Sequence, residues 1–424
     1  MNRPDRWQAY PEYRNSGVTW LGEIPSHWRL VRVKHLCPFR YGDSLPADAR
    51  EQDGSVPVYG SNGLIGYHST ANTTAPALII GRKGSYGKIN LSSTPSFAID
   101  TTYFVDPRHC SADIRWLYYA LRLLGLDSYS QDSAIPGLSR EHAHNHSLPY
   151  IPLPEQRAIA DFLDRETARI DALIAKKQRL IELLQEKRTA LISHAVTKGL
   201  DPDAPMKESG VAWLGEVPAH WKMVRIKHLG QVGNGSTPLR GDLSFWQDGT
   251  FPWLTSTVVN DDVIGEPVEF VTETALRECH LPVVAPNSVL IAITGQGKTR
   301  GKAALLPYEA TINQHIAYVS PRAELLDPKF LQLFLSSAYG ILRILSEGTG
   351  STKGALTCEQ IGEFSVSLPP LSEQRQIVSS TLSKKVDLDC LTQAMNKTII
   401  LLTEYRTALI SAAVTGKIDV RGAA

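Results

Sequence analysis

An internal duplication constrains this sequence more strongly than any other feature. The segment SGVTWLGEIPSHWRLVRVKHL at residues 16–36 returns as SGVAWLGEVPAHWKMVRIKHL at residues 209–229, and 15 of the 21 positions are identical. Average residue usage would give only about one or two matches by chance. A repeat of this kind indicates that one structural unit is present twice. We call these two segments the opening motifs.

A second pair of matching segments predicts two long helices. EQR at residues 155–157 returns at 373–375, and RTALISHAVT from Arg188 returns as RTALISAAVT from Arg406, both at one spacing. A constant spacing over this stretch excludes insertions, as expected of continuous helices. We therefore expect helices near 155–197 and 373–415, each roughly 60 Å long at about 1.5 Å per residue.

The pattern of apolar residues predicts that these helices pair with each other. In both copies seven of ten positions that step by alternating four and three residues are apolar, which is the pattern of a coiled coil. The residues predicted to form this partner interface are Ile170, Leu173, Leu180, Leu184, Leu388, Leu391, Leu402 and Leu409.

Between the constant segments the two copies differ. The predicted fold class is α+β: two mixed α/β domains separated by two long antiparallel coiled-coil helices, in a pseudo-twofold internal repeat. The predicted boundaries are 1–36 for the first opening motif, 37–147 for the first variable domain, 148–200 for the first long helix, 201–229 for the linker and second opening motif, 230–367 for the second variable domain, and 368–424 for the second long helix and tail.

The charge balance limits how this chain could bind nucleic acid. Its 44 Lys and Arg against 43 Asp and Glu exclude a uniformly basic surface, but local basic loops are still allowed because salt screens charges beyond about 8 Å. The sequence has neither an apolar run of about 18 residues nor a signal peptide, so we expect a cytoplasmic protein without membrane contact. Its five scattered cysteines, without a CxxC pair, predict reduced thiols and no metal site.

The repeated segments resemble the specificity subunit of type I restriction-modification systems. The resemblance rests on SGVxWLGExPxHW in both opening motifs, LPxPEQR and LPPLSEQR before the helices, and RTALISxAVT at their ends, and it spans about residues 16–419. It implies two target-recognition domains, each reading one half of a two-part site in double-stranded DNA, held apart by the helices.

The same resemblance implies which partners carry the chemistry. It predicts a chain that is not catalytic and binds no cofactor itself. Two modification subunits would bind S-adenosylmethionine and methylate adenine, and two restriction subunits, where the system has them, would use ATP and Mg.

Glycine-rich basic loops are the candidate DNA contacts. Residues 81–88, GRKGSYGK, combine three cations with three glycines, and residues 294–302, TGQGKTRGK, repeat this combination in a variable domain that is otherwise acidic. Glycine lets backbone amides approach phosphate, and Arg and Lys supply charge. The candidate DNA-binding residues are Arg82, Lys83, Ser85, Tyr86, Lys88, Arg140, Lys298, Arg300, Lys302, Thr352 and Lys353.

Two other functions compete with DNA recognition. Residues 292–299, AITGQGKT, satisfy a loose phosphate-binding loop pattern, but Gly301 and Pro307 follow where that loop needs a helix, so an ATP-dependent enzyme is disfavoured. A coiled-coil scaffold whose variable domains bind protein partners is the second alternative, which the near-neutral charge favours and the basic loops oppose.

Overall fold

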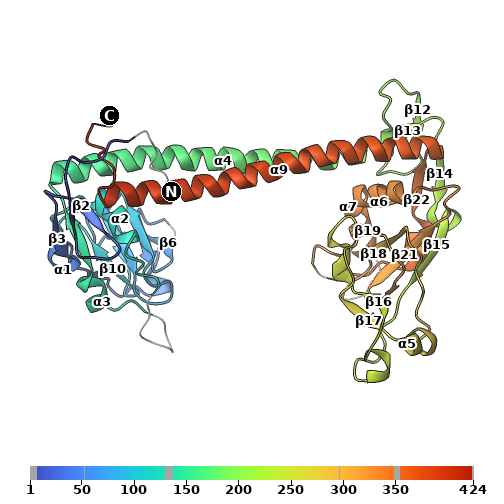
Figure 1. The fold of residues 1–424 in the computed structure, drawn as a ribbon, viewed down its shortest axis with the longest axis horizontal. Helices are drawn as coiled ribbons and strands as arrows, with labels where there is room; N and C mark the ends of the chain where they lie inside the picture. The colour runs from blue at the N-terminus through green and yellow to red at the C-terminus, as the bar shows by residue number, and fades with distance from the viewer. Residues whose placement is uncertain (1–6, 52, 129–136, 296, 348–353, 423–424) are drawn as a thin grey trace. The chain divides into compact units, whose positions relative to one another are not determined.

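The computed structural model describes residues 7–51, 53–128, 137–295, 297–347 and 354–422 (Figure 1). The chain divides into two compact units. Unit 1 consists of Met1–Gln178 and Asn396–Ala424, and unit 2 of Arg179–Met395. Each unit therefore contains one opening motif, one variable domain, and parts of both long helices.

The two long helices predicted from the repeat are confirmed. Helix α4 spans Leu153–Lys198 and helix α9 spans Leu371–Val414 (Figure 1). Proline in or just before the first turn of each suits a helix start, because the first amides have no partner within the helix. A glycine with positive φ follows each helix, Gly199 at 81° and Gly416 at 72°. A side chain on Gly416 would approach Pro25 to 2.4 Å, so glycine lets the opening motif pack against the helix end.

Within each unit the start of one long helix lies beside the end of the other. In unit 1 Ile170 of α4 and Leu409 of α9 belong to one buried core, and Arg406 forms an ion pair with Asp171 at 2.9 Å. In unit 2 the repeat-related residues Arg188 and Asp389 form the corresponding pair at 3.4 Å. The same interhelix contact thus occurs twice, as a pseudo-twofold frame requires.

The register of the helix seam differs from the prediction at every second position. Ile174 and Thr392 are half-buried, whereas the predicted seam residues Leu173, Leu180 and Leu391 are exposed. The predicted partners Ile170, Leu388 and Leu409 are buried, and Leu184 and Leu402 are half-buried. The steps of three and four are therefore taken in the opposite order, because the heptad pattern alone fits two neighbouring stripes on a leucine-rich helix.

The variable domains share one topology. Each has a four-stranded antiparallel sheet in the same order and a three-stranded sheet with one parallel pair. In unit 1 these are β4 (Arg40–Tyr41), β10 (Thr102–Val105), β7 (Ala77–Gly81) and β8 (Ile89–Ser92), then β6 (Gly63–His68), β5 (Val56–Gly60) and β9 (Phe97–Ala98). In unit 2 they are β15 (Gly230–Asn234), β21 (Ile316–Pro321), β18 (Ser288–Ala292) and β19 (Ala303–Leu306), then β17 (Glu269–Val271), β16 (Phe251–Leu254) and β20 (Thr311–Ile312).

Short strand pairs connect the opening motifs to the rest of each unit. The pairs are β1 (Tyr13–Asn15) with β2 (Glu23–Pro25), β3 (Arg29–Arg32) with β11 (Ser147–Tyr150), β12 (Met206–Glu208) with β13 (Glu216–Pro218), and β14 (Lys222–Arg225) with β22 (Ser365–Leu368). The strand before each long helix therefore pairs with the opening motif of its own unit, which explains why these segments repeat together.

Shorter helices complete the domains and their cores. They are α1 (Val33–Leu36), α2 (Ile114–Arg122), α3 (Arg140–Asn145), α5 (Glu273–Glu278), α6 (Pro328–Ser337), α7 (Tyr339–Glu347) and α8 (Cys358–Glu363), with 3-10 turns η1 (Ala47–Ala49), η2 (Ile226–His228), η3 (Leu243–Phe245) and η4 (Ser256–Asn260). Trp116 of α2 shares a buried core with Ile159 of α4, and Phe330 of α6 shares one with Ile377 of α9. Each domain is thus packed onto a long helix through a continuous apolar core.

Candidate nucleic-acid interface

The repeated glutamate at the start of each long helix fastens the opening motif. Glu155 accepts hydrogen bonds from the Trp28 indole at 3.1 Å and the Tyr10 hydroxyl at 2.6 Å, and it pairs with His27 at 3.0 Å. Burial, followed by the hydrogen bond to Glu155, raises the pKa of Tyr10 and keeps its hydroxyl a donor. These contacts are structural, which accounts for the repeated His-Trp pair.

Glu373 makes the matching contacts in unit 2. It accepts a hydrogen bond from the Trp221 indole at 3.0 Å and pairs with His220 at 2.8 Å. The repeated glutamine that follows binds the variable domain, because Gln156 accepts from the Asp113 amide at 2.7 Å and Gln374 from the Asp327 amide at 2.8 Å. The two aspartates cap α2 and α6, so each EQR segment joins opening motif, domain and long helix.

In unit 1 the candidates Arg82 and Arg140 meet at Tyr41, which is 47% exposed. The guanidinium groups of Arg82 and Arg140 lie 5.3 and 4.7 Å from the centroid of the Tyr41 ring, within the range of cation–π contact. The backbone explains why two distant segments meet here: Lys83 forms a β-bridge with Gly137, and the Leu138 amide donates to the Arg82 carbonyl at 2.8 Å. This arrangement presents two positive charges and an aromatic face.

The other candidates in unit 1 occupy the same loop. Lys83, Ser85 and Lys88 are exposed, whereas Tyr86 is half-buried and packs against the domain core. The Lys88 ammonium donates to the Asn62 side-chain oxygen at 2.9 Å. The loop therefore presents hydroxyl and ammonium groups, while Tyr86 mainly supports it.

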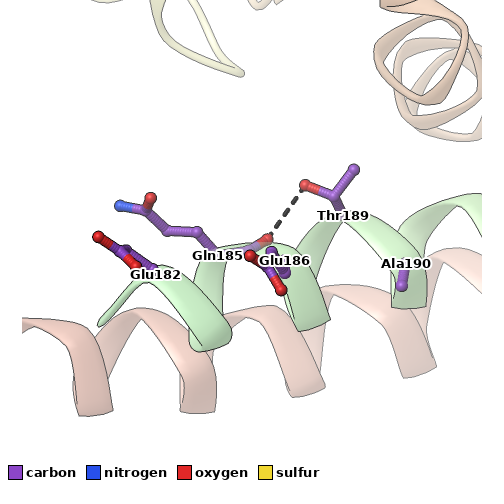
Figure 2. Close-up of a pocket in the computed structure, with 5 residues that line it drawn as sticks. All are labelled: Glu182, Gln185, Glu186, Thr189 and Ala190. Atoms are coloured by element: carbon purple, nitrogen blue, oxygen red, sulfur yellow. Dashed lines mark hydrogen bonds between the residues drawn. The ribbon is translucent and has the colours of Figure 1, made fainter. Parts of the chain in front are cut away.

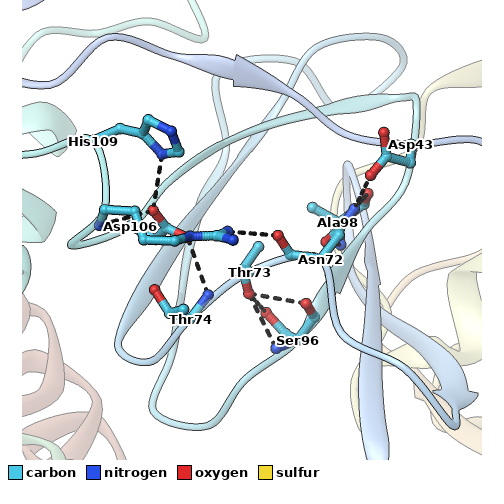
Figure 3. Close-up of polar contacts among 9 residues, drawn as sticks. Asp43, Asn72, Thr73, Thr74, Ser96, Ala98, Asp106 and His109 are labelled. Atoms are coloured by element: carbon cyan, nitrogen blue, oxygen red, sulfur yellow. Dashed lines mark hydrogen bonds and ion pairs between the residues drawn. The ribbon is translucent and has the colours of Figure 1, made fainter.

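A polar network in the same domain fixes the position of Asp43, two residues after Tyr41 in the sequence (Figure 3). Asn72 donates to the Asp43 carboxylate at 2.8 Å and to the Ala98 carbonyl at 2.9 Å. Deeper in the domain, buried Asp106 accepts from Arg108 and from the Thr74 amide. Burial opposes ionisation of Asp106, but these hydrogen bonds outweigh it and lower its pKa, so it remains a fixed anion in the scaffold.

In unit 2 the loop at residues 294–302 lies at the same place in the topology. Lys298 is exposed, and Lys302 donates to the Asn260 side-chain oxygen at 3.2 Å. The Tyr339 hydroxyl donates to the Lys298 carbonyl at 2.8 Å, and Arg343 to the Gly297 carbonyl at 2.6 Å. Helix α7 thus holds the backbone of the loop while the Lys298 side chain faces solvent.

Arg300 requires a correction to the predicted interface. Its side chain is only 7% exposed, donates to the Gly354 carbonyl at 2.8 Å, and forms an ion pair with Glu347 at 3.2 Å. We therefore remove Arg300 from the candidate DNA contacts: a guanidinium buried in this way serves the fold. The predicted contacts Thr352 and Lys353 lie outside the described residues.

Sequence reasoning missed a cluster of polar side chains beside the second loop. Thr294 and His315 are joined by a hydrogen bond of 2.7 Å, Gln314 contacts the His315 ring at 3.3 Å, and Thr237 donates to Gln314. These residues come from three separate segments, so no local pattern unites them. The available sequence signals were GNGSTPLRGD at residues 233–242, TINQHIAYV at residues 311–319, and the predicted loop that begins at Thr294.

The structure does not support a phosphate-binding loop that begins at Ala292. A phosphate-binding loop must open a helix, but residues 297–299 lead into β19, which pairs antiparallel with β18. Among the described residues, no group of three or more His, Cys, Asp or Glu side chains is placed to hold a metal ion.

In the same part of the chain, no helix is both long enough and apolar enough to cross a membrane.

Comparison with known proteins identifies the family. Residues 25–183 and 218–399 match the type I restriction modification DNA specificity domain. The chain belongs to this family. Membership favours DNA recognition by the variable domains over the protein-binding scaffold.

Curated relatives and solved structures agree with this membership. The specificity subunit of EcoR124I/EcoR124II from Escherichia coli is 23% identical over 62% of this chain and 61% of its own length, so the chain matches less than two thirds of that relative. The MjaIX specificity subunit from Methanocaldococcus jannaschii is 20% identical over 98% of both.

The fold is also known from experiment. A chain from a type I R-M system studied for complex assembly superimposes with a TM-score of 0.69 at 17% identity, covering 92% of this chain and 98% of its own. The HsdS subunit from Thermoanaerobacter tengcongensis does so with a TM-score of 0.54 at 18% identity, covering 93% and 98%. At these identities the likeness shows the fold.

The long helices of this family member carry a second kind of surface. Leu173 and its repeat counterpart Leu391 are 39% and 50% exposed, and Leu183 and its counterpart Leu401 are 44% and 54% exposed. Unit 1 holds Leu173 and Leu401, and unit 2 holds Leu183 and Leu391. Each unit thus presents the same two exposed leucines.

A shallow hollow lies on the surface of α4 in unit 2. Glu182, Gln185, Glu186, Thr189 and Ala190 line it, all from one helix (Figure 2). The Thr189 hydroxyl donates back to the Gln185 carbonyl at 3.1 Å. Carboxylates and an amide on an open helix surface suit a polar protein contact better than a small-molecule site.

Proposed function

We propose that this chain is the specificity subunit of a type I restriction-modification complex and that each variable domain reads one half of a two-part sequence in double-stranded DNA. One observation carries the proposal: both domains place a glycine-rich basic loop at the same point of the same topology, with different side chains around it. In unit 1 these are Tyr41, Arg82 and Arg140. In unit 2 they are Thr237, Gln314 and His315. One scaffold with two sets of polar groups suits a target with two unlike halves.

The repeated exposed leucines support two copies of one protein partner. We assign these patches to two modification subunits, which would carry S-adenosylmethionine and methylate adenine. Where the system includes restriction subunits, they would supply ATP hydrolysis with Mg. On this proposal the chain itself has no catalytic role and binds no cofactor, and the two long helices set the distance between the half-sites.

Sequencing of methylated bases tests the DNA function. Deleting the gene should abolish adenine methylation at one two-part sequence, and expressing the chain from a plasmid should restore it. Unchanged methylation after deletion, in cells where the modification subunit is still made, would contradict the proposal.

Native mass spectrometry of the purified complex tests the docking patches. Replacing Leu173 and Leu401 by Ala should remove one modification subunit, and replacing Leu183 and Leu391 should remove the other. Val386→Ala is a matched control, because Val386 is 58% exposed on α9 but its repeat counterpart is Ala168. Two subunits retained in both double variants would move the docking surface elsewhere.

A further inference from the structure

Lys88 and Lys302 occupy the same backbone position in two domains whose sequences differ. In unit 1 the Gly87 amide donates to the Gly81 carbonyl, and the Gly81 amide donates to the Lys88 carbonyl, both at 2.8 Å. In unit 2 the Gly301 amide donates to the Ala292 carbonyl at 2.8 Å, and the Ala292 amide donates to the Lys302 carbonyl at 3.1 Å. Gly87 and Gly301 both have positive φ, at 74° and 86°. Each loop therefore closes in the same way and places a lysine directly after the closing glycine.

Each of these lysines is held by an asparagine from another segment. Lys88 donates to the Asn62 carbonyl at 2.7 Å and to its side-chain oxygen at 2.9 Å, and Lys302 donates to the Asn260 side-chain oxygen at 3.2 Å. Asn62 lies between β5 and β6, and Asn260 ends η4, which follows β16. The strands β5 and β16 are topologically equivalent, yet the local sequences SNG and VVN share no pattern that predicts the pair.

The asparagines fix side chains that would otherwise be mobile. Lys88, Asn62 and Asn260 are exposed, and Lys302 is half-buried. Ordering a free lysine side chain costs rotamer entropy. Asn260 is itself held, since it donates to the Thr257 carbonyl at 2.9 Å and accepts from the Thr299 hydroxyl at 3.3 Å. These hydrogen bonds order the lysine side chains before a ligand binds. Binding of a hydrogen-bond acceptor therefore costs less conformational entropy.

The chemistry of the pair selects an anionic acceptor. An ammonium group can donate three hydrogen bonds. Lys88 donates two of them to Asn62, and Lys302 donates one to Asn260. The remaining protons suit a phosphate oxygen. A device that is alike in both domains cannot encode the difference between two half-sites, whereas every stretch of duplex offers the same phosphates.

We propose that Asn62 and Asn260 are positioning residues that hold Lys88 and Lys302 as matched donors, each binding one phosphate of the DNA backbone. The two domains would then sit on the backbone in the same way, and the unlike side chains nearby would read the bases. This inference rests on the proposed DNA function and adds a specific contact to it.

The salt dependence of DNA binding tests the lysines in the assembled complex with the modification subunits. The probes are a duplex carrying the sequence found methylated in cells and a scrambled duplex of equal length. Lys88→Ala and Lys302→Ala should each reduce the slope of log affinity against log salt by about 0.9, and the double variant by about twice that. Discrimination between the two probes should not change. Lys329→Ala controls for charge loss, because Lys329 lines a groove beside α9 and not this loop.

Variants of the asparagines separate positioning from charge. Asn62→Ala and Asn260→Ala should weaken binding several-fold while the slope stays within about 0.3 of the wild-type value, because the ammonium keeps its charge. Asn62→Asp should weaken binding further, because its carboxylate repels phosphate. Thermal unfolding of each variant should match the wild type, which a purely structural role would not allow.

These experiments separate failure of the proposed DNA function from failure of the proposed phosphate contact. A wild-type complex that does not prefer the methylated sequence overturns the proposed function itself. Wild-type preference combined with an unchanged slope in the lysine double variant overturns only the phosphate contact. A changed base preference at one position of the methylated site also overturns it, because the lysine would then read a base.

Discussion

The two variable domains share their strand order but differ in the side chains around their basic loops. Their sheets have the same strand order, and their basic loops close through equivalent backbone hydrogen bonds. Around those loops the side chains differ in kind. Unit 1 presents two arginines against the Tyr41 ring, and unit 2 presents hydroxyl, amide and imidazole groups around His315. Backbone geometry is therefore shared, and chemical identity is what separates one domain from the other.

The frame that holds the domains is also not fully symmetric. The side chain of Glu155 is 6% exposed and accepts from Tyr10 as well as from Trp28. The side chain of Glu373 is 26% exposed and accepts from Trp221, without a tyrosine donor among the described residues. Each glutamate also pairs with a histidine. Tyr10 precedes the first opening motif and has no repeat counterpart, because Asp203 stands at the matching position. The same fastening is thus stronger in unit 1.

The largest expected effect follows from that asymmetry. Glu155→Ala leaves the Tyr10 hydroxyl and the Trp28 indole without their acceptor, and we expect a loss of about 3 kcal/mol in the stability of unit 1. Glu373→Ala should cost unit 2 about 2 kcal/mol. Hydrogen exchange of the amides in residues 24–28 and 217–221 measures both. Equal losses would show that Tyr10 adds nothing.

The next effect concerns recognition in unit 1. Tyr41→Ala removes the ring that orders Arg82 and Arg140, and we expect about 1 kcal/mol of lost DNA affinity, roughly fivefold in Kd. Tyr41→Phe keeps the ring and should bind nearly as well as the wild type. Fluorescence anisotropy with the methylated sequence provides the comparison. Equal losses in both variants would assign the role to the hydroxyl.

A smaller effect is expected at the repeated ion pairs between the long helices. Arg188 meets both Asp389 and Asp262, a residue of the variable domain, whereas Arg406 meets Asp171. We expect Arg188→Ala to destabilise unit 2 by about 1 kcal/mol and Arg406→Ala to destabilise unit 1 by about 0.5 kcal/mol. Chemical denaturation of each variant, followed by a probe in unit 1 and a probe in unit 2, would show which substitution costs more stability. A larger loss for Arg406→Ala would contradict the added contact.

The smallest effect is a pH dependence confined to unit 1. His144 accepts the Phe39 amide at 2.9 Å, and burial, with Arg140 and Lys34 nearby, lowers its pKa below 6.5. The unfolded chain therefore takes up the proton first, so this stabilisation is present above pH 6.5 and is lost as the pH falls through the folded pKa. The protection factor of the Phe39 amide, which corrects the exchange rate for its intrinsic pH dependence, should fall on acidification. His144→Gln should abolish that dependence, and a dependence retained in this variant would contradict the assignment.

The repeat predicted the architecture because duplication constrains long elements strongly. Two helices of constant spacing and two variable domains follow from matching segments alone. The seam register did not follow, because Leu173 and Ile174 are both apolar and only the packing decides between them. Because Leu173 is exposed and not part of the seam, we propose it as a contact for a modification subunit, which periodicity alone could not predict.

The sequence predicted those parts of the candidate interface whose residues lie close together in one segment of the chain. The glycine-rich loops were visible as sequence, and so were Arg82 and Lys298. The burial of Arg300 depends on Glu347 and Gly354, which lie far along the chain. Asn62, which holds Lys88, lies between β5 and β6, and Asn260, which holds Lys302, ends η4, so their role appears only when the sheets are assembled.

Exchange of one variable domain tests the central claim most directly. Residues 37–147 would be replaced by the matching segment of a relative that methylates a different sequence, and the methylated sites would be sequenced. If each domain reads its own half, one half of the target should change while the other half and the spacer stay the same. Simultaneous change of both halves would contradict the division of recognition between the two domains.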